Sequence, residues 1–395
     1  MTIAFIYDCA YPYVKGGVER RIFEMAKRLS TKHQILMITM KWWKGEGELK
    51  LKGNIYLHGV CPKTQLYTPS GRRKILPALL FSISLIPSLF KVNPDVIDCQ
   101  NIPYLPTLAC KLFCILRDRP LIITWHEIWG DYWYQYLGWR GVFGKLIEKL
   151  TSRLTKHNIA NSPHTLKRFR EISHMPITLI PPGVDLKRIK ETRPSSQSFD
   201  LLFVGRLIPE KNVEALIRVI ASIDIKLTCA IIGDGPERGR LKRLADEPGL
   251  SGRIKFLRFV PEVYPYMKSS RIFVFPSKRE GFGMVVIEAN ACGVPVILLD
   301  HPHNAAVGLI EDGRNGFVCG DEDEMRDRIV QLLKDRGIWE GMRRDALRMA
   351  KRYSWDRIVG DYERFIEGCF EVEKGYSSGL DGSVDPTAFK EDRDI

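Results

Sequence analysis

Two glutamates that lie eight positions apart carry the first chemical signal in this sequence. They are Glu280 and Glu288, in the stretch EGFGMVVIE. A pair of carboxylates could act as the acid and the nucleophile of a glycosidase, or it could bind sugar hydroxyls. Inside one helix, side chains eight positions apart differ by roughly 80° in direction, so the two would not converge.

The glycines in this stretch decide where a helix begins. The sequence GFG disfavours a helix interior, so we expect the helix to begin at Gly283 or Met284 and to end at the Cys-Gly-Val-Pro that follows. Glu280 then lies in the loop before the helix, and Glu288 lies in its second turn. The free N–H groups of the first turn lie between them and favour an anion. Carboxylates for hydroxyls and amides for phosphates predict a nucleoside-diphosphate-sugar site.

A second loop combines two cations with a proline turn. In GRLIPEKN, Arg206 and Lys211 follow an apolar run at 199–205 and precede a helix. Two cations at the carboxyl end of a strand suit a diphosphate, because Arg binds phosphate in a bidentate manner and Lys acts as a point charge. A solvated loop is the alternative.

Glycines open two further loops. In GGVE, Gly16 and Gly17 precede an amphipathic helix, so their backbone N–H groups could approach a phosphate or a sugar. An ordinary strand-to-helix turn explains the same glycines. In GDGPE, at 233–237, the glycine spacing of a dinucleotide-binding fingerprint fails, and the motif indicates a tight turn.

The segments that carry these loops alternate between strand and helix patterns. Apolar runs of strand length occur at 2–7, 34–40, 92–100, 120–127 and the start of 157–169, and again at 199–205, 226–233, 253–259, 271–276 and 294–300. Two such series predict an α/β protein with two doubly wound parallel sheets, whose ligands bind at the carboxyl ends of the strands. The segment 187–199 loses apolar periodicity and predicts a linker.

We therefore expect four segments along the chain. The first two are an acceptor-side domain at 1–190 and a nucleotide-sugar-binding domain at 191–354. An amphipathic helix at 355–372 follows them. The polar residues 373–395 are expected to be disordered.

Taken in chain order, the motifs resemble a known enzyme family. These motifs are GGVE (16–19), the segment around His126, GRLIPEKN (205–212), GDGPE (233–237) and EGFGMVVIE (280–288). In this order they are similar to the motifs of the family 4, or group 1, retaining glycosyltransferases of the GT-B fold. The resemblance implies two doubly wound Rossmann-like domains whose parallel sheets face a central cleft, with the last helix crossing back to the first domain. It also implies hexose transfer from a nucleoside-diphosphate sugar, with retention of configuration and without a catalytic metal or a cofactor.

The same resemblance implies a role for each motif residue. Arg206 and Lys211 would hold the donor diphosphate, which agrees with the negative charge that builds up on a departing nucleotide. Glu288 would bind ribose hydroxyls, Glu280 the transferred sugar, and His126 would lie at the reaction centre. The implied catalytic residues are His126, Arg206, Lys211 and Glu280, and the implied donor-binding residues are Gly16, Gly17, Gly205, Arg206, Lys211, Gly283, Met284, Val285 and Glu288.

Other functions share this fold and stay open at this point. A nucleotide-sugar epimerase would need no acceptor, and a phosphorylase would need a cofactor lysine that no motif identifies. A catalytically silent sugar-nucleotide-binding protein would not need the complete set of motif residues. No metal site is expected, because His301 and His303 are typical of a loop pair and the acidic run at 321–323 is typical of a helix start.

Charge separates the two halves of the chain. Residues 1–190 carry a net charge of +16, whereas the rest of this +13 chain carries −3. A basic half predicts an anionic partner, although a charged surface that serves solubility explains it equally well. No nucleic-acid-binding motif accompanies it, so we expect no nucleic acid as partner. We expect instead an anionic membrane surface and a lipid-linked or cell-envelope glycan acceptor.

Two segments bear on this membrane hypothesis. Trp129, Trp133 and Tyr136 lie at helical spacing, which is typical of a core stripe and also of a membrane interface. The apolar run 75–90, preceded by Arg72, Arg73 and Lys74, is short for a membrane span, and a buried helix is favoured. Without a signal-peptide pattern, and with nine scattered cysteines typical of reduced thiols, we expect a cytoplasmic protein, peripheral on the membrane.

Overall fold

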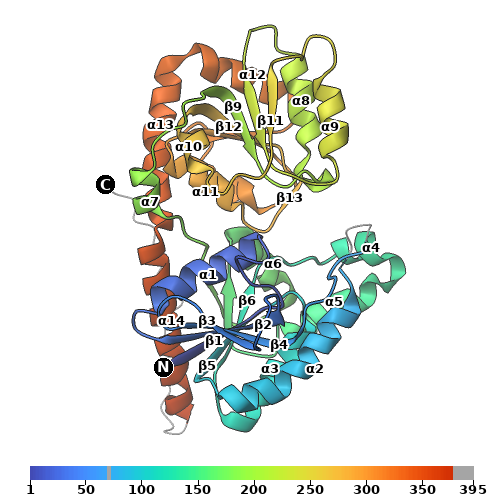
Figure 1. Cartoon of the computed structure of the whole chain (residues 1–395), viewed down its shortest axis with the longest axis vertical. Coiled ribbons are helices and arrows are strands. Elements are labelled where there is room, and N and C mark those ends of the chain that lie inside the picture. The colour runs from blue at the N-terminus through green and yellow to red at the C-terminus, as the bar shows by residue number, and fades with distance from the viewer. Residues whose placement is uncertain (69–72, 377–395) are drawn as a thin grey trace.

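The computed structural model describes residues 1–68 and 73–376, which form two α/β domains, one above the other in Figure 1. The N-terminal domain is built on an eight-stranded sheet in the order β3-β4-β2-β1-β5-β6-β7-β8. Neighbouring strands are parallel except β3 and β4, which pair antiparallel. Its strands are β1 (Thr2–Ile6), β2 (Gln34–Lys41), β3 (Glu48–Lys50), β4 (Ile55–Pro62), β5 (Val96–Gln100), β6 (Leu121–Trp125), β7 (His157–Ala160) and β8 (Ile177–Leu179).

Helices cover both faces of this sheet. They are α1 (Gly17–Leu29), α2 (Ile75–Val92), α3 (Leu105–Arg117), α4 (Tyr132–Leu137), the 3-10 helix η1 (Gly138–Arg140), α5 (Gly141–Thr151) and α6 (Pro163–Ile172). On one face, α2, α3 and α5 pack through residues such as Phe81, Phe113 and Ile147. On the other face, α1 and the last helix, α14 (Trp355–Tyr376), pack through Met25 and Tyr362. Because both faces are covered, β1 and β6 are nearly continuous apolar runs.

The C-terminal domain repeats this plan with a parallel six-stranded sheet in the order β11-β10-β9-β12-β14-β16. Its strands are β9 (Phe199–Val204), β10 (Cys229–Ile232), β11 (Ile254–Leu257), β12 (Ser270–Phe275), β14 (Val296–Leu299) and β16 (Gly316–Cys319), and a separate pair joins β13 (Arg279–Glu280) to β15 (His303–Asn304). Its helices are α7 (Leu186–Glu191), α8 (Val213–Ala221), α9 (Arg238–Ala245), α10 (Tyr264–Lys268), α11 (Met284–Ala291), α12 (Glu322–Lys334) and α13 (Arg336–Ala350), with 3-10 turns at Pro209–Lys211, Ala305–Leu309 and Lys351–Tyr353.

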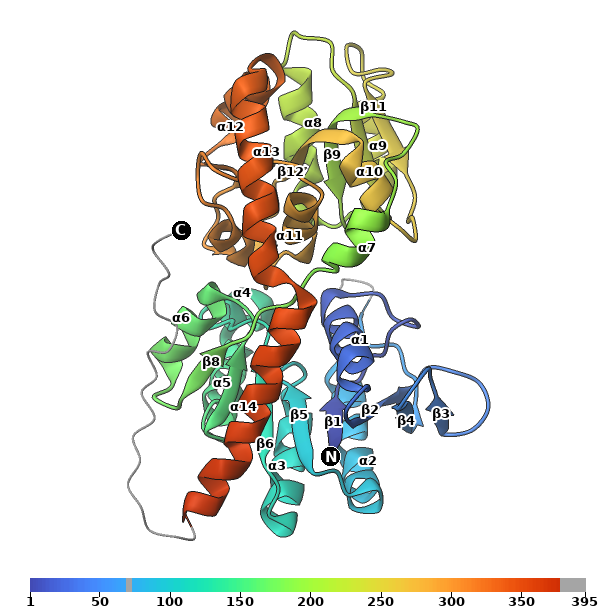
Figure 2. The same ribbon diagram turned by 90° about the vertical axis from the view of Figure 1, so that its left-hand side faces the viewer.

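The last helix joins the two domains. After α13, α14 runs back along the N-terminal domain, as Figure 2 shows in red. The Tyr362 hydroxyl donates a hydrogen bond of 2.8 Å to Asp98 Oδ2 in β5. The helix expected at 355–372 continues to Tyr376, so the expectation of disorder was wrong for 373–376. Residues 377–395 of the expected tail lie outside the described part of the chain.

Two expectations about segments were wrong in part. The linker expected at 187–199 begins with a helix, α7, because Asp185 caps it by accepting a hydrogen bond from the Arg188 N–H. The apolar run that was favoured as a buried helix forms α2, but only a third of this helix is buried. By length and composition α2 could cross a membrane. Arg72, one of the cations before it, lies outside the described residues.

Candidate active site

The predicted donor loops meet where the carboxyl ends of the two sheets face each other. Gly17 begins α1 in the N-terminal domain, and Met284 begins α11 in the C-terminal domain. A Cβ atom on Gly17 would lie only 3.9 Å from Met284 Sδ. Two helix N-termini from different domains therefore approach each other, and both favour an anion between them.

The start of α11 requires glycine. Gly283 is the N-cap residue, with φ 96° and ψ 54° in the left-handed region, and a Cβ atom there would lie 2.6 Å from Ala306 Cβ. The predicted helix start is confirmed. Within the described residues, the N–H groups of Met284 and Val285 have no hydrogen-bond acceptor, as expected in a first helical turn. They are available to a ligand.

Glu288 is buried in the second turn of α11. Its Oε1 atom forms an ion pair with Arg20 at 2.8 Å and accepts a hydrogen bond from the Tyr264 hydroxyl at 3.1 Å. Its Oε2 atom is also buried but has no partner among the residues described. Burial raises the pKa of Glu288, while the charge of Arg20 lowers it. An unsatisfied buried carboxylate oxygen is unfavourable, so this atom is a ready acceptor for a ligand hydroxyl.

Arg20 is a site residue that the sequence analysis missed. It lies three positions after Gly17 on α1, so it faces the same side of the helix as the glycine that opens it. The Arg20 guanidinium also donates a hydrogen bond of 2.9 Å to the Tyr264 hydroxyl. Its spacing from the glycine motif could have identified Arg20 as a candidate. Its partners in the other domain, Glu288 and Tyr264, could not have been inferred from the sequence.

The two cations of the GRLIPEKN loop have different environments. Lys211 forms an ion pair with Glu280, which also accepts a hydrogen bond of 2.8 Å from Ser277 Oγ. Lys211 therefore neutralises Glu280 in this structure, a contact that the sequence analysis did not foresee. Arg206 follows Gly205 directly after β9, is exposed, and has no side-chain partner within the described residues. Burial raises the pKa of Glu19, in the first turn of α1, and the charge of Arg206 opposes this shift.

His126 follows β6 and is 92% buried, with 8% of its surface exposed. Its Nε2 atom lies 2.7 Å from Gln100 Oε1, and because a carboxamide oxygen only accepts, Nε2 carries the proton. Burial, together with the charge of Arg21, lowers the pKa of His126 to about 3. The ring is therefore neutral near pH 7. A Cβ atom on Gly281 would lie 2.8 Å from the His126 carbonyl, so the Glu280 loop packs closely against this residue.

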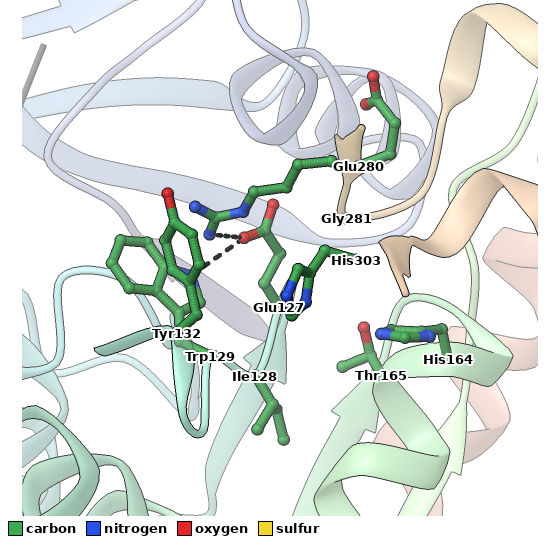
Figure 3. Close-up of a pocket in the computed structure, with 10 residues that line it drawn as sticks. Glu127, Ile128, Trp129, Tyr132, His164, Thr165, Glu280, Gly281 and His303 are labelled. Carbon is green, nitrogen blue, oxygen red and sulfur yellow. Dashed lines mark hydrogen bonds and ion pairs between the residues drawn. The ribbon is translucent and has the colours of Figure 1, made fainter. Parts of the chain in front are cut away.

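A small cavity lies beside Glu280 between the two domains (Figure 3). Glu127, Trp129 and Tyr132 line it from the N-terminal domain, and Arg279 and His303 line it from the C-terminal domain. Arg279 forms an ion pair with Glu127, and its guanidinium carbon lies 4.4 Å and 4.1 Å from the Trp129 and Tyr132 ring centroids. His301 and His303 form a loop pair whose ring centroids are 5.6 Å apart.

The aromatic stripe packs mainly on itself. The Trp129 ring centroid lies 4.6 Å from that of Trp133 and 4.9 Å from that of Tyr136. Trp133 also contacts Tyr104 in the core. These residues are half-buried, so the structure favours the packing interpretation over the membrane interpretation for the stripe.

The geometry defines the class of protein. Two Rossmann-like domains with parallel sheets face each other across the predicted donor loops, which is the GT-B arrangement. The model of "Glycosyltransferase Family 4" matches residues 15–188, and that of "Glycosyl transferases group 1" matches residues 186–352. The chain belongs to the family 4, or group 1, glycosyltransferases.

Individual proteins resemble it over different lengths. An uncharacterized glycosyltransferase of Methanocaldococcus jannaschii is 30% identical over 382 residues, which cover 90% of this chain and 95% of that protein. The GDP-mannose-dependent monoacylated alpha-(1-6)-phosphatidylinositol monomannoside mannosyltransferase of Corynebacterium glutamicum is 29% identical over 239 residues, 51% of this chain and 58% of that protein. HepE of Anabaena, solved in complex with UDP-glucose, has a TM-score of 0.72 at 20% identity and covers 93% of this chain and 100% of its own.

Proposed function

We propose that this glycosyltransferase moves a hexose from a nucleoside-diphosphate sugar to a lipid-linked or cell-envelope glycan acceptor, with retention of configuration and without a metal or a cofactor. The observation that carries the proposal is the unpartnered, buried Oε2 atom of Glu288 next to the bare N-terminus of α11. A ribose hydroxyl would satisfy the carboxylate oxygen. The adjoining diphosphate would lie against the helix amides.

The remaining motif residues would complete this donor site. Arg206 would face the diphosphate, where its charge stabilises the negative charge on the leaving nucleotide. Gly17 would approach the same group from the other domain. Glu280, held by Lys211 and Ser277, would contact the transferred sugar, and neutral His126 would lie beside it.

Support for the donor and acceptor comes from proteins of similar fold or sequence. HepE was solved with UDP-glucose, and the Corynebacterium protein is named as a GDP-mannose-dependent enzyme that acts on a phosphatidylinositol mannoside. Mannose, glucose, galactose and N-acetylhexosamine all remain compatible with the site. A lipid-linked acceptor also agrees with the net charge of +16 in residues 1–190 and with a cytoplasmic protein that is peripheral on the membrane.

Thermal-shift assays with UDP, GDP, ADP and their sugars test the donor site. We expect one nucleotide to stabilise the protein, by about 2.7 kcal/mol at a concentration 100 times its Kd. Glu288→Gln should bind it roughly 10-fold or more weakly, because a hydrogen bond to an ionised carboxylate contributes about 1.5–3 kcal/mol. Glu247→Gln, at an exposed position of the same domain, is the matched control and should bind normally.

Turnover distinguishes transfer from its alternatives. The nucleotide should be released by transfer of the sugar to an acceptor or, without an acceptor, by slow hydrolysis of the donor. Arg206→Ala should lower the rate of nucleotide release more than it lowers nucleotide affinity. Sugar-nucleotide isomers formed without an acceptor would instead identify an epimerase. The absence of stabilisation by any of the three nucleotides would refute the proposed donor site.

A further inference from the structure

Exposed apolar side chains gather on one part of the N-terminal domain. Most of the large hydrophobic residues that are exposed within the described chain lie between positions 75 and 150. They are Ile75, Leu76, Leu79, Leu80 and Ile83 of α2, Leu112, Ile115 and Leu116 of α3, Tyr134 of α4, and Trp139, Val142, Phe143, Leu146 and Leu150 of η1 and α5. The others are scattered. A cluster of exposed apolar side chains on a protein surface marks an interaction site.

The three helices present these residues on one surface. α2, α3 and α5 pack on the same face of the eight-stranded sheet, and α2 and α3 are in contact. Their outward sides therefore face away from the sheet together, on the side of the N-terminal domain that carries these labels in Figure 1. We call the outer faces of α2, α3 and α5, with Trp139, the helical apolar surface.

The charge on these helices has one sign. α2, α3 and α5 carry no exposed carboxylate, because their one acidic residue, Glu148, is 1% exposed and accepts a hydrogen bond from the Tyr104 hydroxyl. Basic residues lie among and beside the apolar ones: Lys91, Lys111, Arg117, Arg140, Lys145, Lys149 and Arg153. They outnumber the exposed carboxylates beside the helices, Asp118 after α3 and Asp131, which pairs with Lys145. Leu, Ile, Phe and Trp together with Lys and Arg are the composition of helices that lie in the interface of an anionic bilayer.

The packing of α2 indicates that it lies on a membrane rather than crosses it. α2 is long and apolar enough for a span, but Phe81, Leu85 and Leu89 are fully buried against the sheet. If α2 left the domain to cross a bilayer, the apolar core residues that pack against these three side chains, such as Phe113 of α3 and Leu36 of β2, would lose their cover and be exposed to water. Its exposed side is available to lipid while its inner side stays in the core.

We propose that the helical apolar surface docks this enzyme on an anionic lipid bilayer. The apolar side chains enter the headgroup boundary, and the basic side chains contact lipid phosphates. The surface also adjoins the active site. Tyr132 of α4 lines the cavity beside Glu280, and η1, which carries the exposed Trp139, follows α4 directly. Resting on the proposed function, this path would bring a lipid-anchored acceptor to the cleft.

Co-sedimentation with vesicles tests the docking surface. We expect the full chain to bind vesicles that contain phosphatidylglycerol, to bind pure phosphatidylcholine vesicles much more weakly, and to dissociate at high salt. Phe143→Glu combined with Leu146→Glu should weaken binding roughly 10-fold or more, because two exposed apolar anchors are lost. Both side chains are exposed, so the fold should persist. Leu347→Glu, an exposed apolar position on α13 in the other domain, is the matched control and should bind as wild type.

The outcomes separate this proposal from its rivals and from the donor site. Equal binding to both vesicle types, or no binding at low salt, would overturn it. A dimer in light scattering that the α5 double variant dissociates would assign the surface to a second copy of the chain and would also overturn it. The nucleotide thermal shift of the double variant should equal that of wild type, so a failure of docking does not count against the donor site.

Discussion

At the residue scale, the charge of Glu288 is balanced across the domain boundary. The carboxylate belongs to α11, whereas its counter-charge, Arg20, belongs to α1 of the other domain. The side chain of Glu288 is 2% exposed and that of Arg20 is 35% exposed. Burial alone would favour the protonated form of Glu288, and Arg20 opposes this. The ionised state that would bind a ribose hydroxyl therefore depends on a contact between domains.

Removing Arg20 should make stability depend on the ionisation of Glu288. We expect Arg20→Met to lower the free energy of unfolding by about 1–3 kcal/mol at pH 8, less than for a fully buried pair because Arg20 is partly exposed. The pKa of Glu288, already raised by burial, rises further without Arg20, so the folded state gains a proton as the pH falls and the loss shrinks. Urea titrations at pH 8 and pH 5 measure the difference.

The double variant with Glu288→Gln is the control for this prediction. It removes the uncompensated charge and should regain most of the lost stability. A loss for Arg20→Met that is the same at both pH values, or that the second substitution does not relieve, would show that Arg20 acts through packing alone.

At the element scale, the start of α11 is set by one backbone conformation. Gly283 lies in the left-handed region, and the space for a Cβ atom is taken by Ala306. The same residue aims the free N–H groups of the first turn at the cleft. A short stretch of chain thus fixes both the direction of the helix and the position of its positive end.

Gly283→Ala should therefore affect stability and donor binding together. We expect a loss of about 1–3 kcal/mol from the strained φ and the clash, and weaker nucleotide binding because the first turn must shift. Gly308→Ala is the control, since a Cβ atom there meets nothing within 4 Å. Thermal melts with and without nucleotide measure both effects. Normal binding by a destabilised Gly283→Ala protein would remove α11 from the donor site.

At the scale of the whole molecule, paired side chains hold the two domains across the cleft. Arg20 pairs with Glu288, Arg279 pairs with Glu127, and Lys15 lies 4.1 Å from the Phe259 ring centroid. α14 and the chain before α7 connect the domains covalently, and α6 also packs against the 3-10 turn Ala305–Leu309. Because these pairs across the cleft are few among the described residues, they permit hinge motion between the domains. The degree of domain closure therefore depends on a small number of side-chain pairs.

Breaking one of these pairs should open the molecule. We expect Arg279→Ala to increase the radius of gyration in solution scattering without nucleotide, because the guanidinium loses both Glu127 and the two aromatic rings. Saturating donor should reduce the difference, since it would bind both domains. Arg336→Ala, which breaks an exposed pair with Glu340 inside α13, is the control. Scattering profiles identical for wild type and Arg279→Ala would contradict this account.

Much of the fold could be predicted from local pattern. Apolar runs and periodicity identified most strands of both parallel sheets, because strands buried on both faces are nearly continuous apolar runs. The strands β3, β4, β8 and β16 and the pair β13–β15 were missed. β3, β8, β13 and β15 are only two or three residues long and β16 has four residues, whereas the longer β4 is interrupted by His58 and Gly59. Glycine spacing placed the start of α11 correctly, because it depends on backbone conformation within a few residues.

The sequence by itself determined which chemical groups the loops carry: carboxylates, cations and glycine-opened helices in the order of a known family. Only the tertiary structure decided which of them meet. Arg20 and Glu288 are far apart in sequence, as are Glu127 and Arg279, and Lys211 and Glu280, which also form an ion pair. It likewise decided that α2 is exposed on one side. Periodicity reports that a face is apolar, whereas the packing of distant segments decides whether anything covers it.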